Sequence, residues 1–138
     1  MIYHSIRFVL KPEVTPEEKA AVVAKMREQF DAIPAVKARV VGSDFGGKYE
    51  LGAVLVIEDI EGYAEYMNHP AHLELDRVGL PLVQEFMSSD ITDDPDPEIG
   101  AKIAEVHRNR FENVPDIAEL ISGLAEYTGS AAPGKHGS

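Results

Sequence analysis

Two kinds of hydrophobic spacing alternate over the first 92 residues, and their order restricts the possible fold more than any other feature. Apolar residues recur at every second position in residues 2–10, as in a β-strand with one buried face, and at helical spacing in residues 16–33. The patterns then follow in the order strand, strand, helix, strand, at 36–45, 49–58, 60–77 and 84–92. The order βαββαβ predicts a ferredoxin-like α+β domain with an antiparallel sheet.

Short polar and proline signals predict where the helices begin and end. Thr15 stands before Pro16, so that its hydroxyl caps a helix whose first position is a proline, and Pro34 ends that helix. Asp59 is placed to cap the second helix, and Pro70 interrupts and restarts it. We therefore expect a break within the second helix.

The sheet is expected to have helices on one face only. Its run Ala53–Ile57 is almost continuously apolar, which is typical of a strand covered on both faces. Since the helices of this plan cover one face, the other face needs a partner, and a second copy of the chain is the simplest one. We predict a homodimer that forms through the sheet face.

The chain is expected to divide into a domain at residues 1–94 and an extension at 95–138. The extension begins with an acidic, proline-rich linker, and apolar stripes predict helices at 99–106 and 117–124. These helices are too short to bury their stripes alone, so we expect them to lie on the domain or on the second copy. From Gly129 onward the composition predicts a disordered tail.

Charge and composition exclude several classes of function. The chain carries 24 acidic and 13 basic residues, a net charge of -11, so most of its surface repels nucleic acid and anionic membranes. No apolar stretch approaches the roughly 20 residues that span a bilayer, and the N-terminus does not read as a signal peptide, so we expect a cytoplasmic protein. With no cysteine, disulfides, thiolate catalysis and cysteine-ligated metals are excluded.

One heptapeptide in the second helix, together with the first strand, resembles a known family. The segment Tyr66-Met67-Asn68-His69-Pro70-Ala71-His72 is similar to the Tyr-x-x-His-Pro-x-His signature of the stress-responsive A/B barrel (Dabb) family. His4 in the first strand and Lys11-Pro12 after it match the same family. The resemblance covers residues 1–94 and implies a dimeric α+β barrel, in which two sheets face one another.

The resemblance also implies candidate site residues. Plant polyketide cyclases of this family close a ring by an aldol reaction with a histidine and a tyrosine, and matching their motif places these roles on His72 and Tyr66. The histidine of the first strand falls on His4. Such a site uses no cofactor and accepts a small hydrophobic or phenolic ligand.

Chemistry at these positions is compatible with that role. An imidazole titrates near pH 6.5, so His72 can act as a general base. Tyr66 lies six residues earlier, on nearly the opposite face of an unbroken helix, but a break at Pro70 brings both towards one cavity. The structural alternatives are a helix-start histidine satisfied by backbone or solvent, a tyrosine at the rim with its hydroxyl in water, and a core His4 satisfied by hydrogen bonds.

A metal site is not expected. His69 and His72 have a suitable i, i+3 spacing, but no Glu-x-x-His or His-Glu-x-x-His motif accompanies them, and His69 is better placed as a helix cap. The acidic run Asp90–Glu98 lacks the glycine and terminal glutamate of a calcium-binding EF-hand loop. We interpret it as a solvated linker.

Two hypotheses of function remain. In the first, the protein is a cofactor-independent small-molecule enzyme that removes a proton beside a carbonyl, leading to aldol cyclisation, isomerisation or oxygenation. In the second, it is a non-catalytic dimeric stress-response or ligand-binding protein with structural histidines. If the stripe at 117–124 lies across the pocket, regulation by the extension is a third option.

Overall fold

The computed structural model describes residues 1–130, which form one five-stranded sheet with helices on one side. The strand order is β2-β3-β1-β4-β5, with every pair antiparallel except β4 and β5. In chain order the elements are β1 (Ile2–Leu10), α1 (Pro16–Asp31), β2 (Val36–Ser43), β3 (Leu51–Ile57), α2 (Ile60–Asn68), α3 (Pro70–Gly79), the 3₁₀ helix η1 (Leu80–Leu82), β4 (Val83–Thr92), α4 (Ile99–Asn113), α5 (Pro115–Ser122) and β5 (Glu126–Gly129). The ferredoxin-like α+β fold is confirmed.

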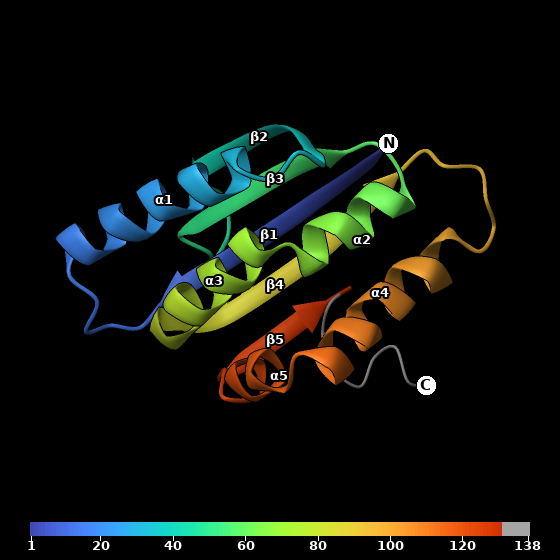
Figure 1. The fold of residues 1–138 in the computed structure, drawn as a ribbon. Helices are drawn as coiled ribbons and strands as arrows, with labels where there is room; N and C mark the ends of the chain where they lie inside the picture. Colours follow the sequence, from blue (N-terminus) through green and yellow to red (C-terminus); the bar gives the residue numbers. More distant parts are fainter. Residues whose placement is uncertain (131–138) are drawn as a thin grey trace.

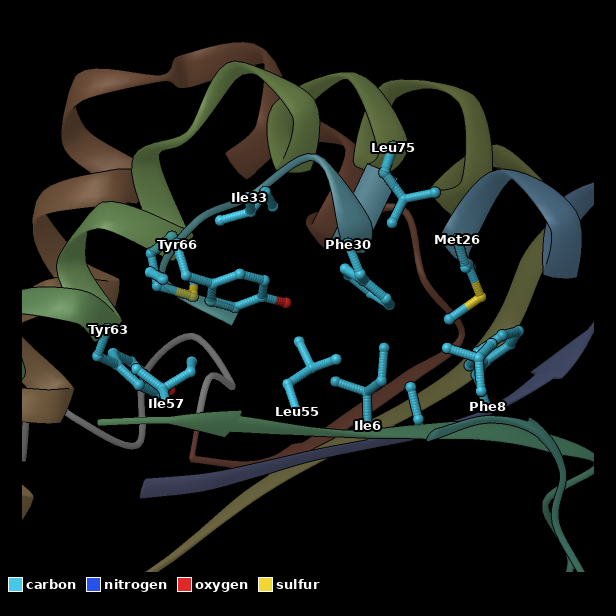
Figure 2. Close-up of a cluster of buried hydrophobic side chains, with 14 of the residues drawn as sticks. Ile6, Phe8, Met26, Phe30, Ile33, Leu55, Ile57, Tyr63, Tyr66 and Leu75 are labelled. Atoms are coloured by element: carbon cyan, nitrogen blue, oxygen red, sulfur yellow. The ribbon is translucent and has the colours of Figure 1, made fainter. Parts of the chain in front are cut away.

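The helices of the first 92 residues and those of the extension occupy different places (Figure 1). Helices α1, α2 and α3 lie over one face of the sheet, with α4 packed against α2 and α5 against α3. Apolar side chains fill the space between α1 to α3 and the sheet, including Phe30, Leu55 and Tyr66 (Figure 2). The extension therefore lies on its own domain, one of the two expected places.

The predicted helix caps form. Thr15 accepts a hydrogen bond from the backbone of Glu18, and Asp59 accepts one from the backbone of Gly62. The side chain of His69 accepts a hydrogen bond from the backbone N–H of Ala71 and so caps α3. The second helix is thus broken at His69 into α2 and α3.

The sheet face away from the helices is open. The apolar run in β3 was expected to be covered by helices on one face and by a second copy of the chain on the other, and the structure shows the first of these covers. Leu55 faces the helices and is fully buried, whereas Val54 on the opposite face is 38% exposed. Tyr3, Val40 and Ile91 are also exposed, from 46% to 73%. The open face of β3 is therefore apolar as well, and no segment among residues 1–130 covers it.

Strand β5 was not predicted. It adds to the free edge of β4 in parallel, and Ser130 donates a backbone hydrogen bond to the carbonyl of Ser88. A strand of four residues without an alternating apolar pattern leaves no sequence signal. The predicted disordered tail is therefore wrong for Gly129 and Ser130, and its remainder, 131–138, lies outside the described residues.

The close contact between β1 and β3 predicts that Gly52 does not tolerate a side chain. A Cβ at Gly52 would lie 2.8 Å from the backbone oxygen of Ile6, which cannot move without disturbing the strand pair. Gly52→Ala is therefore expected to lower the free energy of unfolding by about 1–3 kcal/mol, measured by urea denaturation. Gly42 pairs with Gly52 from β2 and has nothing within 4 Å of an added Cβ, so Gly42→Ala is the matched control. Equal effects of the two substitutions would contradict this prediction.

Candidate functional site

A cavity of about 60 Å³ lies between the helices and the sheet. Apolar side chains such as Phe8, Met26 and Phe30 form most of its wall. The remaining wall carries the polar side chains of His4, Tyr66, His72, Asp76, Ser88, His107, Arg110 and Tyr127. This volume has room for a few water molecules, so a larger ligand requires its wall to move.

The break between α2 and α3 places His72 beside Tyr66. Their rings stack with centroids 4.3 Å apart and planes 14° apart, and Figure 2 shows the Tyr66 ring in the space between helices and sheet. The Nδ1 atom of His72 lies 3.1 Å from the backbone carbonyl of Tyr66. Because a carbonyl only accepts, Nδ1 carries the proton. The other nitrogen, Nε2, therefore has a lone pair, and it lies 3.5 Å from the Tyr66 hydroxyl.

Burial keeps both side chains in their neutral forms. It lowers the pKa of the His72 imidazole from 6.5 to about 3, against the opposing effect of the Asp76 carboxylate. Burial also raises the pKa of Tyr66 well above its ordinary value, and Asp76 adds to that rise. Near pH 7 the pair is a neutral base beside a hydroxyl that keeps its proton.

Asp76 joins His72 to the extension. Its Oδ2 atom lies 3.5 Å from His72 Nε2 and also accepts a hydrogen bond from Nη2 of Arg110, in α4. The side chains of Asp76 and Arg110 are 17% and 4% exposed, so this ion pair is largely buried. Among residues 1–130, the buried Nε of Arg110 has no hydrogen-bond partner.

A second polar network lies next to this pair. His4 Nδ1 is 2.7 Å from one carboxylate oxygen of Asp90, and the Tyr63 hydroxyl donates to the other oxygen over 3.0 Å. The Tyr63 oxygen lies 2.8 Å from Nε2 of His107, and Ser130 also donates to Asp90. His4 is thus satisfied by hydrogen bonds, as in the structural alternative.

The ring of His4 also connects the second network to the first site. Its centroid lies 5.6 Å from that of Tyr66. In the second network, burial raises the pKa of Asp90, but the hydrogen bond from His4 and the charge of His4 outweigh it, so that this pKa lies below its ordinary value. His4 thus contacts both polar groups.

The assignment of Asp90 to a solvated linker is wrong. Asp90 lies in β4 directly opposite His4, and its side chain is 5% exposed. Phe86, Ser88 and Asp90 are spaced by two along this strand, so the alternation of side chains in a strand places Asp90 on the same face as Phe86. A sequence argument that extended this alternation could have found it.

The extension supplies site residues that sequence reasoning missed. His107 and Arg110 follow Ile103 by four and seven residues, so all three share one face of α4 and are buried. His107 and Arg110 were missed because the predicted stripe counted only apolar residues. Their helical spacing from Ile103 was the signal that could have placed them on the buried face of α4.

The Tyr63 hydroxyl predicts a measurable contribution to stability. Tyr63→Phe removes the donor to Asp90 and the contact with His107 without changing the ring, so it is expected to cost about 1–3 kcal/mol of unfolding free energy in chemical denaturation. Tyr3→Phe removes a hydroxyl from an exposed ring on the open sheet face and is the control. A Tyr63→Phe protein as stable as this control would show that the network adds nothing.

Residues 1–130 contain neither a cluster of metal-binding side chains nor a membrane-spanning helix. No three histidine, aspartate or glutamate side chains in residues 1–130 gather closely enough to hold a metal ion. No helix in the same range has the length and apolar character needed to cross a membrane.

Comparisons with known proteins agree with this fold. The sequence model of the stress-responsive A/B barrel domain matches residues 2–93, and no curated protein matches the chain. A dimeric ferredoxin-like protein of unknown function from Thermobifida fusca is 24% identical with a TM-score of 0.61, over 66% of this chain and 89% of its own.

Two similar structures belong to enzymes. A hydroxynitrile lyase from Passiflora edulis is 13% identical with a TM-score of 0.61, over 67% of this chain and 94% of its own. A cofactor-independent oxygenase from Streptomyces nogalater is 17% identical with a TM-score of 0.55, over 70% of this chain and 97% of its own. At these identities the likeness concerns the fold.

Proposed function

The chain belongs to the stress-responsive A/B barrel domain family, and on that premise we propose that it is a cofactor-independent enzyme that removes a proton beside a carbonyl group. His72 is the general base and Tyr66 the hydroxyl donor. His4 supports the ring of Tyr66 from β1. The reaction class includes aldol closure, isomerisation and oxygenation, which share this first step.

One observation carries the proposal: the buried neutral imidazole of His72 has its Nδ1 proton held by a carbonyl and its Nε2 lone pair beside the Tyr66 hydroxyl. A base must be unprotonated at the working pH, and burial keeps His72 in that form. Because a pKa of about 3 also makes the resting imidazole a weak base, proton transfer requires that its imidazolium form be stabilised. The imidazolium formed by proton transfer would lie next to the Asp76 carboxylate, which favours it. Two structural relatives with a named activity, a lyase and an oxygenase, support a catalytic use of this fold.

Solvent deuterium exchange tests this function without knowledge of the substrate. The full chain is incubated in D₂O with a panel of small ketones and phenolic ketones, and the loss of the α-proton signal is followed by NMR. We expect the wild type to accelerate exchange for at least one compound, and His72→Gln to reduce the rate by about 10²-fold or more. His69→Asn keeps a capping side chain on α3 and is the matched control. No acceleration by the wild type, or equal rates in His72→Gln, would contradict the proposal.

The small cavity favours a second candidate, a non-catalytic stress-response or ligand-binding protein. A volume of about 60 Å³ is well below the roughly 300 Å³ at which ligand pockets begin. In that case His72 and His4 only stabilise the fold. The deuterium experiment separates the two candidates, because binding alone leaves α-protons in place.

We further propose that the protein acts as a homodimer through its open sheet face. Tyr3, Val40, Val54 and Ile91 leave apolar surface on this face, and a relative with the same fold is described as dimeric. Light scattering after size exclusion is expected to give twice the monomer mass for the wild type. Val54→Lys places a charge on this face and is expected to give monomers, whereas a monomeric wild type would contradict the proposal.

A further inference from the structure

The extension brings a cation to the cavity wall. Arg110 lies on α4, beyond the 2–93 segment that matches the family, and only 3% of it is exposed. One of its nitrogens donates to Asp76, while its buried Nε–H has no hydrogen-bond partner among residues 1–130. Buried donors in proteins are nearly always paired, so this N–H points to an acceptor that the described residues do not supply.

We propose that Arg110 is a catalytic residue of this protein, whose guanidinium stabilises the negative charge that forms on the carbonyl oxygen of the substrate. The inference rests on the function proposed above and names its substrate class. The substrate is a neutral carbonyl compound with an acidic C–H beside the carbonyl and an otherwise apolar body, since apolar side chains form most of the wall.

The proposed step balances without an oxidant or a cofactor. The C–H bond breaks, and its proton moves to Nε2 of His72. The electron pair of that bond forms a carbon–carbon double bond, while the carbonyl π pair moves to the oxygen and produces an enolate. Arg110 and Tyr66 donate hydrogen bonds to that oxygen, and the proton returns from His72 in the following step.

The charges around Asp76 fit this step. In the resting site Asp76 and Arg110 neutralise one another, and His72 is neutral, so a neutral ketone enters without a charge penalty. Proton transfer creates a cation on His72, next to Asp76, and an anion on the substrate, next to Arg110. Each new charge thus gains an opposite charge already in place, which favours the transition state over the ground state.

A ligand with a permanent carboxylate fits less well. It would compete with Asp76 for Arg110 and leave one of the two carboxylates without a partner in a largely buried site. The arrangement therefore favours a charge that develops during the reaction.

The test uses 4-fluorophenol, whose phenolate mimics an enolate oxygen, and reads its ionisation by ¹⁹F NMR on the full chain. The bound probe is expected to ionise at lower pH than the free probe. Arg110→Gln is expected to raise the pKa of the bound probe by about 1–3 units, and Arg110→Lys by less, because it retains the charge. Arg108 is exposed on the same helix, so Arg108→Gln is the matched control and should behave as the wild type. If Arg110→Gln fails to fold, the double variant Asp76→Asn, Arg110→Gln removes both charges and serves in its place.

The outcomes separate this inference from the proposed function. If the bound probe has the same pKa in the wild type and the Arg110 variants, the role of Arg110 is overturned, while His72-dependent deuterium exchange would leave the proposed function standing. If the wild type does not bind the probe up to its solubility, the substrate class is overturned. A pKa of the bound probe that rises in the Arg110 variants and not in Arg108→Gln supports the inference.

Discussion

Asp76→Asn is expected to lower the free energy of unfolding by about 3–5 kcal/mol, because it leaves the charge of Arg110 buried without its partner. The guanidinium side chain is only 4% exposed, so bulk water screens its charge far less than it would at the surface. The substitution is nearly isosteric, so the loss reflects charge and not packing. Urea denaturation at pH 7 measures it.

A neighbouring pair provides the control. Arg77, next to Asp76 in α3, forms an ion pair with Asp116 of α5, and both side chains are about half exposed. Asp116→Asn is expected to leave the free energy of unfolding nearly unchanged, since water screens that pair. Similar costs for Asp76→Asn and Asp116→Asn would contradict a buried charge pair, and adding Arg110→Met to Asp76→Asn should restore part of the loss.

Acidification from pH 7 to pH 4 is expected to cost the folded protein roughly 3 kcal/mol through His72 alone. The unfolded chain binds a proton at His72 near pH 6.5, whereas the folded chain resists it until about pH 3. Stability from this group is therefore complete above pH 6.5 and falls as pH decreases towards 3. At pH 4 the difference spans about 2.5 units, at about 1.36 kcal/mol each.

Chemical denaturation at several pH values tests this expectation. His72→Gln cannot take up the proton, so its unfolding free energy should change much less between pH 7 and pH 4. His69→Asn retains His72 and should keep the wild-type slope. Stopping at pH 4 leaves Asp90, with its lowered pKa, mostly ionised. Equal slopes for the wild type and His72→Gln would show that His72 titrates normally in the folded protein.

Local signals were sufficient to predict most of the fold. The capping residues Thr15 and Asp59, and the break at Pro70, each act on their own backbone neighbours, so sequence reasoning could place them. That break also predicted that Tyr66 and His72 meet, and they do. Their catalytic roles stay predictions.

Side chains that meet only through tertiary packing were harder to predict from the sequence. Asp90 is paired because β4 lies antiparallel to β1 in the register that sets it opposite His4. Arg110 reaches Asp76 because α4 folds back along α2, after a linker whose path no local signal defines (Figure 1). Asp90 and Arg110 are both polar, and a prediction that follows only apolar spacing passes over polar residues on a buried face.

The apolar run in β3 predicted cover on both faces of the sheet, by helices on one and by a second copy of the chain on the other. Its alternating residues are apolar on both sides, which a pattern cannot distinguish from burial inside one chain. The chain covers one side with helices and leaves Val54 exposed. The apolar pattern requires cover on both faces of the sheet. The helices cover one face, and the other needs a partner.

The protonation state of His72 decides whether this side chain can act as a base, and long-range ¹H–¹⁵N NMR of the imidazole reads it directly. We predict a neutral ring with its proton on Nδ1, held by the Tyr66 carbonyl, and no titration of that ring between pH 7 and pH 4. A ring protonated on Nε2, or one that titrates near pH 6.5, would contradict the account, because Nε2 would then offer no lone pair to a substrate in the cavity.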